Sequence, residues 1–209
     1  MKPTLSPRPD RRRVRTRKQL ADALFSLIME RGYDDLTVQE ISDRADVSRA
    51  TFYLHFNDKD DLLLTTLAER YDEIVAQLPT LTLDNLLPEG TPPCTVAFQQ
   101  AAEYRALYRI VLSSATAPIL HLGIKSYLTD RLREEYEVFA RDHGITSMAI
   151  PMDILMEHLA SSLMGLIVWW LGQDDPSLTV ERMSYLYHQM NVRSWMIAFG
   201  IQEPVQPSS

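Results

Sequence analysis

The chain has 209 residues, of which 45% are hydrophobic and only seven are glycine, and its formal net charge at pH 7 is −7. That length is sufficient for one or two compact domains with a sizeable core, and the acidic balance excludes a protein that is basic throughout. The single cysteine, Cys94, excludes an intrachain disulfide, which fits a reducing cytoplasm.

Positive charge is concentrated at the start of the chain. Residues 1–59 hold 12 Lys and Arg against 9 Asp and Glu, whereas residues 60–209 hold 9 against 19. Residues 1–12 also contain three prolines, so we expect them to form a disordered basic arm. The basic side chains of the arm and of the helix after it are either solvated or in contact with DNA. We favour DNA contact, and we expect it for Arg15 and Arg17.

Apolar spacing predicts an all-α protein, with a helix-turn-helix head at 13–58 and a larger helical bundle at 59–209. The longest uncharged apolar stretch, residues 159–173, is shorter than the roughly 20 residues needed to span a bilayer, so we expect a buried helix and no membrane contact. Helices are expected at about 13–31, 37–45, 48–56, 58–77, 95–114, 119–143, 151–171 and 180–199, with a proline-rich loop at 78–94.

Residues 37–59 have the pattern of two short helices joined by a tight turn. Thr37 and Glu40 can form a capping box, and Ser48 can cap the second helix. Phe52 and Phe56 lie four residues apart and can anchor that helix to the core. Singly, its polar residues could be solvated surface groups, but together they indicate DNA binding. Those expected at bases or phosphates are Thr37, Gln39, Arg49, Thr51, Tyr53, His55 and Lys59, with Arg49 suited to guanine.

The sequence TVQEISDRADVSRATFYLHFNDKDDLL resembles the pattern T-x-x-x-I-A-x-x-A-G-V-S-x-x-T-F-Y-x-H-F-x-x-K-x-x-L-L of the TetR family of bacterial transcription regulators. The resemblance covers residues 13–62. It implies a homodimer that binds palindromic double-stranded DNA, an all-helical ligand-binding body, and groove contacts from Ser48 and Ala50. One departure is Asp46, where the family usually has Gly in a turn that often needs positive φ, which Asp tolerates better than most residues.

The body is expected to hold the dimer contact and any effector. Residues 98–112 and 165–171 resemble, more weakly, C-terminal domains of some TetR-like proteins. The last two helices have broad apolar faces that form either intrachain core or a dimer interface, and the expected interface includes Ser161, Gly165, Leu186 and Met190. Larger body side chains are either core or the lining of an effector pocket, and the pocket candidates are Tyr104, Tyr108, His121, Tyr127, Met156, Trp169 and Trp170.

The sequence carries no catalytic motif, and its five histidines have no metal-ligand spacing, so we expect neither an enzyme nor a cofactor. It predicts a cytoplasmic bacterial transcription regulator, a repressor rather than an activator, that an unknown small-molecule effector releases from DNA. The alternative is a TetR-like regulator or co-activator that acts through a protein partner without a small ligand.

Overall fold

The computed structural model describes residues 11–76, 82, 92–113, 115 and 117–200, and in those residues it contains helices and no strand. The prediction of an all-helical protein is therefore confirmed. The helices are α1 (Arg11–Arg31), α2 (Val38–Arg44), α3 (Arg49–Tyr53), α4 (Lys59–Val75), α6 (Thr95–Glu103), α7 (Arg105–Leu112), α8 (Ala117–Asp142), α9 (Met152–Leu171) and α10 (Val180–Phe199).

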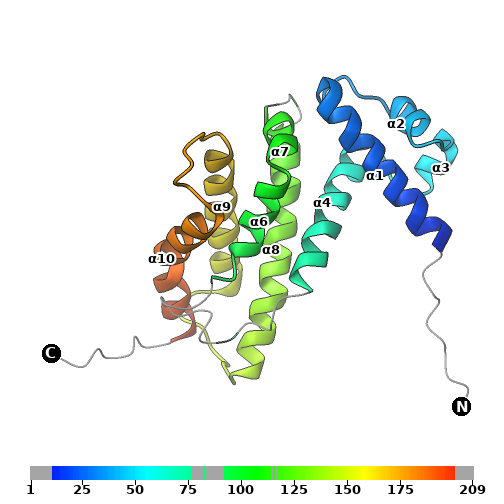
Figure 1. The fold of residues 1–209 in the computed structure, drawn as a ribbon. Coiled ribbons are helices and arrows are strands. Elements are labelled where there is room, and N and C mark those ends of the chain that lie inside the picture. Colours follow the sequence, from blue (N-terminus) through cyan, green and yellow to red (C-terminus); the bar gives the residue numbers. More distant parts are fainter. Residues whose placement is uncertain (1–10, 77–81, 83–91, 114, 116, 201–209) are drawn as a thin grey trace, which may run out of the picture.

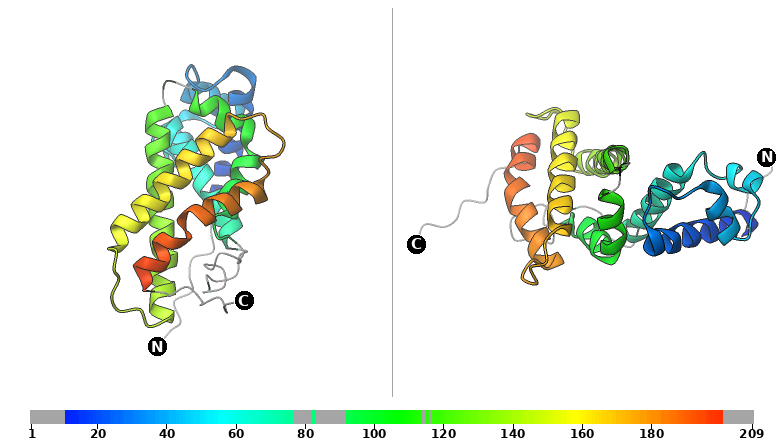
Figure 2. Two further views of the ribbon diagram at one scale, coloured as in Figure 1. Left: turned by 90° about the vertical axis from the view of Figure 1, so that its left-hand side faces the viewer. Right: turned by 90° about the horizontal axis from the view of Figure 1, so that it is seen from above.

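The helices form a small head and a larger body. Figures 1 and 2 show α1, α2 and α3 together at one end of the molecule, with α6 to α10 at the other. Helix α4 joins the two parts, because it packs against α1 in the head and against α6 and α8 in the body. We use head for residues 11–58 and body for residues 59–200.

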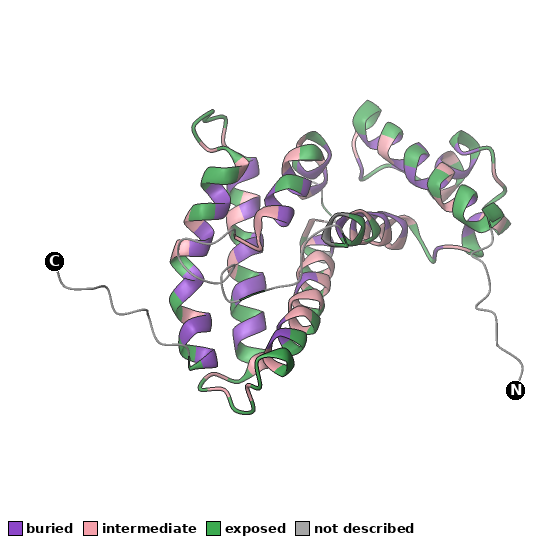
Figure 3. Cartoon of the chain, turned by 60° about the horizontal axis from the view of Figure 1, so that its bottom comes forward, coloured by how far each residue is buried: buried purple, intermediate pink, exposed green. Residues whose placement is uncertain are grey.

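One buried apolar cluster runs from the head into the body. It includes Leu24 of α1, Phe52 of α3, Leu63 of α4 and Phe98 of α6, none of which has measurable exposure. Figure 3 shows this buried side of each helix facing its neighbours. Because packed interiors transmit displacement, a shift of α4 in the body is expected to reach the head.

A second contact between head and body lies away from α4. Both carboxylate oxygens of Asp34, in the loop after α1, accept a hydrogen bond from the backbone N–H of Ala115, each at 3.1 Å. The rings of Phe25 and Tyr104 also meet across the junction, with centroids 5.9 Å apart. The head is thus held to the body at the α7–α8 connection as well as through α4.

Several expected helix limits differ from the structure. Helix α3 ends at Tyr53, before the expected residue 56, and α8 begins at Ala117, before the expected residue 119, because Pro118 fits its first turn. Helix α1 begins at Arg11, two residues before the expected start, and residues 1–10 of the expected arm lie outside the described residues. The expected helix at 95–114 is wrong, because the chain breaks at Tyr104 (φ −103°, ψ 23°) into α6 and α7. No Pro or Gly marks this break; instead Arg105 donates to the carbonyl oxygens of Trp170, at 3.1 Å, and Gln173, which ties the start of α7 to the end of α9.

Helix α9 is long and apolar enough, by length and composition alone, to cross a membrane. Half of that apolar window is buried inside the protein. Its buried residues, which include Leu163 and Met156, contribute to both core clusters. This is the burial expected of the core helix predicted for the stretch at 159–173.

Candidate DNA-binding surface and body cavity

The second helix of the head begins with the predicted capping box. The Oγ1 of Thr37 accepts a hydrogen bond from the N–H of Glu40 at 3.3 Å, and the carboxylate of Glu40 accepts one from the N–H of Thr37 at 2.9 Å. Two N–H groups that have no partner within the helix are thereby satisfied. The start of α2 is fixed, and Thr37 and Gln39 remain exposed on it.

The turn between α2 and α3 confirms the expected strain at Asp46. Its φ is 56°, and it is the non-glycine residue with positive φ in the described part of the chain. The chain then returns through a hydrogen bond from the N–H of Val47 to the carbonyl oxygen of Ser42, at 3.0 Å. Ser48 caps α3, because its Oγ accepts from the N–H of Thr51 at 3.0 Å.

Helix α3 is anchored on one side and bare on the other. Phe52 is 0% exposed and Phe56 is 4% exposed, with ring centroids 6.0 Å apart. Beside this anchor the guanidinium of Arg49 lies 5.8 Å from the ring centroid of Tyr53 and donates to its hydroxyl at 3.3 Å. Within the described part of the chain, this pair leaves guanidinium N–H groups available to an external acceptor such as a base edge or a phosphate.

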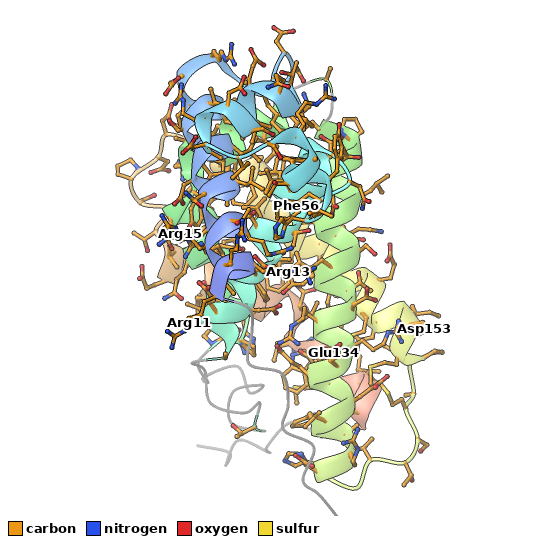
Figure 4. The ribbon with its side chains drawn as sticks, turned by 90° about the vertical axis from the view of Figure 1, so that its right-hand side faces the viewer. Arg11, Arg13, Arg15, Phe56, Glu134 and Asp153 are labelled. Carbon is orange, nitrogen blue, oxygen red and sulfur yellow. The ribbon has the colours of Figure 1, made fainter. Side chains whose placement is uncertain are left out.

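Most of the predicted DNA-facing residues are exposed on the head. Figure 4 shows Arg11, Arg13 and Arg15 along the first turns of α1 in the head, whereas Glu134 and Asp153 lie on the body. The side chain of Thr51 is half-buried, and its hydroxyl is hydrogen-bonded to the hydroxyl of Ser48. The predicted residues that are exposed are Arg15, Thr37, Gln39, Ser48, Arg49, Ala50 and Tyr53.

Arg17 and Lys59 already have partners inside the protein. The guanidinium of Arg17 lies 4.5 Å from the ring centroid of Phe56 and pairs with Glu69 at 2.5 Å. The ammonium of Lys59 donates to the carbonyl oxygens of Tyr33, at 3.0 Å, and Asp34, at 2.7 Å. Both cations therefore help to hold α4 to the head, a role that sequence reasoning missed.

His55 is half-buried beside the basic end of α1. Burial, followed by the positive charges of Arg13 and Arg17, holds its pKa below the usual value. Its Nδ1 is buried and has no hydrogen-bond partner among the residues that the structure describes. At neutral pH the ring is neutral, so a phosphate contact would come from a ring N–H and not from an ionic charge.

Leu54 is a second feature that sequence reasoning missed. It follows Tyr53 at the end of α3 and is 76% exposed, the largest exposure among the large hydrophobic residues that the structure describes. The surrounding pattern of polar residues gave no reason to single it out.

The body contains a cavity of about 240 Å³ lined by α4, α6, α7, α8 and α9. Of the predicted pocket residues, Tyr108 and Tyr127 line it. The hydroxyl groups of Tyr71 and Tyr108 make no hydrogen bond within the described part of the chain, and burial raises the pKa of both, so they stay protonated donors. No charged residue is found among the lining residues, which are Leu64, Thr65, Leu67, Ala68, Tyr71, Ala97, Gln100, Ala101, Tyr108, Leu112, Gly123, Ile124, Tyr127, Leu128, Met164 and Ile167.

The other five predicted pocket residues lie outside this cavity. Tyr104 packs on the head, and His121 is half-buried on α8. Met156 belongs to the second core cluster, while Trp169 is 51% exposed. Trp170 is core, and its indole N–H donates to the carbonyl oxygen of Leu178 at 2.7 Å. Aromatic residues alone could not reveal the cavity, because residues that complete its wall, such as Ala97 and Ala101, are small.

The exposed surface of α9 and α10 is partly apolar, and it also holds Glu157, His158 and Arg193. It carries Ile154 (61% exposed) and Trp169 on α9, and Met190 (64%) and Ile197 (59%) on α10. Of the predicted interface residues Ser161 and Gly165 lie exposed on α9, and Leu186 is half-buried on α10. A Cβ added at Gly165 would meet no atom within 4 Å, so this position is small although the chain's own packing does not require it.

Three comparisons with known proteins agree with this arrangement. Residues 20–66 match the family model described as bacterial regulatory proteins, tetR family. A crystal structure of a TetR transcriptional regulator from Streptococcus agalactiae 2603V is 31% identical, with a TM-score of 0.54, over 87% of this chain and 96% of that one. A putative TetR-family regulator from Syntrophomonas wolfei has a TM-score of 0.62 at 15% identity, over 93% and 98% of the two chains.

Among curated proteins, the uncharacterized HTH-type regulator YwcC of Bacillus subtilis (strain 168) is 41% identical over 101 residues, which are 47% of this chain and 44% of YwcC. The regulator YxbF of the same organism is 24% identical over 78% of this chain, which spans only 41% of the length of YxbF. The similarity to YwcC is therefore limited to less than half of each protein.

Proposed function

Because the chain belongs to the TetR family of bacterial regulatory proteins, we propose that it is a homodimeric, sequence-specific DNA-binding repressor of the cytoplasm that a small molecule releases from a palindromic operator. The observation that carries the DNA-binding part is the exposed pair Arg49 and Tyr53 on a helix that Phe52 anchors to the core. A helix presented in this way can enter the major groove, with Arg49 donating to guanine O6 and N7.

The test is binding of the purified protein to duplexes selected from a random pool, followed by fluorescence anisotropy. Arg49→Ala is expected to weaken binding by about 1–3 kcal/mol and to relax the preference at one base pair in each half-site. Arg141→Ala is the matched control, since Arg141 is an exposed arginine on the body helix α8. Equal affinity and equal base preference for Arg49→Ala and the wild type would contradict the assignment.

The dimer is supported by the exposed, partly apolar surface of α9 and α10. Two half-sites on one face of DNA lie one helical turn, roughly 34 Å, apart, so two heads must be linked to read them together. We assign the link to this surface, where Gly165 leaves room for a partner helix. Met190→Asp should shift the protein toward monomer in analytical ultracentrifugation, because it buries a charge in the interface; an unchanged sedimentation coefficient would place the interface elsewhere.

The effector is assigned to the body cavity. Its lining is apolar and uncharged, with the hydroxyls of Tyr71 and Tyr108 as donors, so it suits an uncharged, largely apolar molecule with an oxygen acceptor. Helix α4 forms one wall and leads to the head. At the α4–α8 crossing a Cβ on Gly123 would lie 2.7 Å from Cδ1 of Leu64, so the two helices are in close contact and a ligand between them would displace α4.

Displacement of α4 would change the spacing of the two heads in the dimer. Effector and operator would then disfavour each other by the same factor. The test measures the melting temperature and the operator affinity of the protein with each of two ten-carbon probes, decanol and decanoate. Decanol should raise the melting temperature and lower operator affinity, whereas decanoate should do neither, because its carboxylate would be buried without a cation. A response to decanoate alone would contradict the cavity assignment.

The alternative function, action through a protein partner without a small ligand, requires no body cavity. The cavity of about 240 Å³, where Tyr71 and Tyr108 have no hydroxyl partner among the described residues, favours the small-molecule hypothesis. An absence of any probe-induced shift, combined with normal operator binding, would favour the alternative.

A further inference from the structure

The outward centre of α3 is apolar. Ala50 and Leu54 lie two residues before and two residues after Phe52, which places both about 200° around the helix axis from that buried ring. Leu54 keeps helical geometry (φ −74°, ψ −14°), and its N–H donates to the carbonyl oxygen of Ala50 at 3.2 Å. The two side chains therefore form one strip on the face turned away from the core.

Polar groups border this strip on both sides. Arg49 and Tyr53 lie along one edge and are in contact with each other. Thr51 lies along the other edge and is bonded to Ser48. A single exposed leucine on a protein surface is ordinary, but Leu54 is at the centre of the face that would enter the groove.

The group that such a strip would meet in the major groove follows from the chemistry of base edges. These edges present hydrogen-bond donors and acceptors at every base pair, and the C5-methyl of thymine is their apolar group. We propose that Leu54 is a specificity-determining residue that packs on a thymine methyl, and that the short side chain of Ala50 lets the helix approach closely enough for this contact. The inference rests on the proposed DNA-binding function.

The strip also predicts where that thymine lies. Arg49 and Leu54 are five residues apart, which along a helix is about 7.5 Å. That distance corresponds to roughly two base-pair steps. The thymine is therefore expected within about three base pairs of the guanine bound by Arg49.

The experiment replaces each thymine of the selected operator, in turn, by deoxyuridine, which removes only the methyl group. For the wild type, one position in each half-site should weaken binding roughly fourfold, the effect of one lost buried carbon. Leu54→Ala should bind the unmodified operator more weakly and should be insensitive to deoxyuridine at that same position. Leu122→Ala, which changes a 61% exposed leucine on α8, should retain the wild-type sensitivity.

The outcomes separate the two proposals. If the wild type selects and binds an operator but Leu54→Ala responds to deoxyuridine at every position as the wild type does, the Leu54 contact is overturned and DNA binding stands. If the wild type binds no duplex, both are overturned. Circular dichroism of Leu54→Ala should match the wild type, because the side chain is 76% exposed.

Discussion

Filling the body cavity should stabilise the protein. Ala101, on α6, is 3% exposed and lines the cavity of about 240 Å³. Ala101→Leu adds three carbon atoms, which contribute about 0.8 kcal/mol each when buried. Subtracting roughly 0.5–1 kcal/mol for lost rotamer freedom leaves about 1.5 kcal/mol. In a chain of this size that gain corresponds to a rise of about 3–6 °C in melting temperature, measurable by circular dichroism.

The matched control is Ala160→Leu. Ala160 is 0% exposed and belongs to the same core cluster but does not line the cavity. Extra carbons there have no space, and overpacking should cost about 1–3 kcal/mol. If Ala101→Leu lowered the melting temperature as Ala160→Leu does, the cavity would not be available to a ligand, and the proposed effector site would fail with it.

Three further predictions concern the head. The folded-state pKa of His55 lies below its unfolded value of about 6.5, so on acidification the unfolded state binds the proton first. The free energy of unfolding should therefore be unaffected by His55 well above pH 6.5 and should fall as the pH drops below that value. His55→Asn should flatten this loss in urea unfolding between pH 7.5 and 5.5, and an unchanged slope would show that the ring is not the cause. Asp46→Gly should raise the free energy of unfolding by about 0.5–1 kcal/mol, since glycine has no steric cost at φ 56°; a lower urea midpoint would contradict this. Lys59→Ala should lower the free energy of unfolding by about 1–2 kcal/mol, because the carbonyl oxygens of Tyr33 and Asp34 lose their donor. An unchanged free energy of unfolding, with a change only in the salt dependence of DNA binding, would instead indicate a phosphate contact.

The local signals of the head could be read from the sequence because they act over three or four residues. The capping box of Thr37 and Glu40, the Ser48 cap and the Phe52–Phe56 anchor all depend on spacing along one helix. The strain at Asp46 also follows from a local turn. The all-helical fold followed from the same short-range periodicity.

Features set by tertiary contacts could not be read in this way. The break at Tyr104 depends on Arg105, whose acceptors lie 65 and 68 residues further along the chain. The internal partners of Lys59 come from a loop 25 and 26 residues earlier. The cavity depends on small residues such as Ala101 as much as on aromatic ones. Periodicity carries no signal for any of these.

The central claim is that two copies of α3 read two related half-sites of DNA. The most direct measurement is sequencing of duplexes enriched from a random pool by the wild-type protein. The account predicts an inverted repeat whose half-site centres lie roughly 10 base pairs, or a multiple of that, apart, and loss of the enrichment at one position per half-site for Arg49→Ala. Recovery of unrelated sequences, or of a motif without two-fold symmetry, would contradict it.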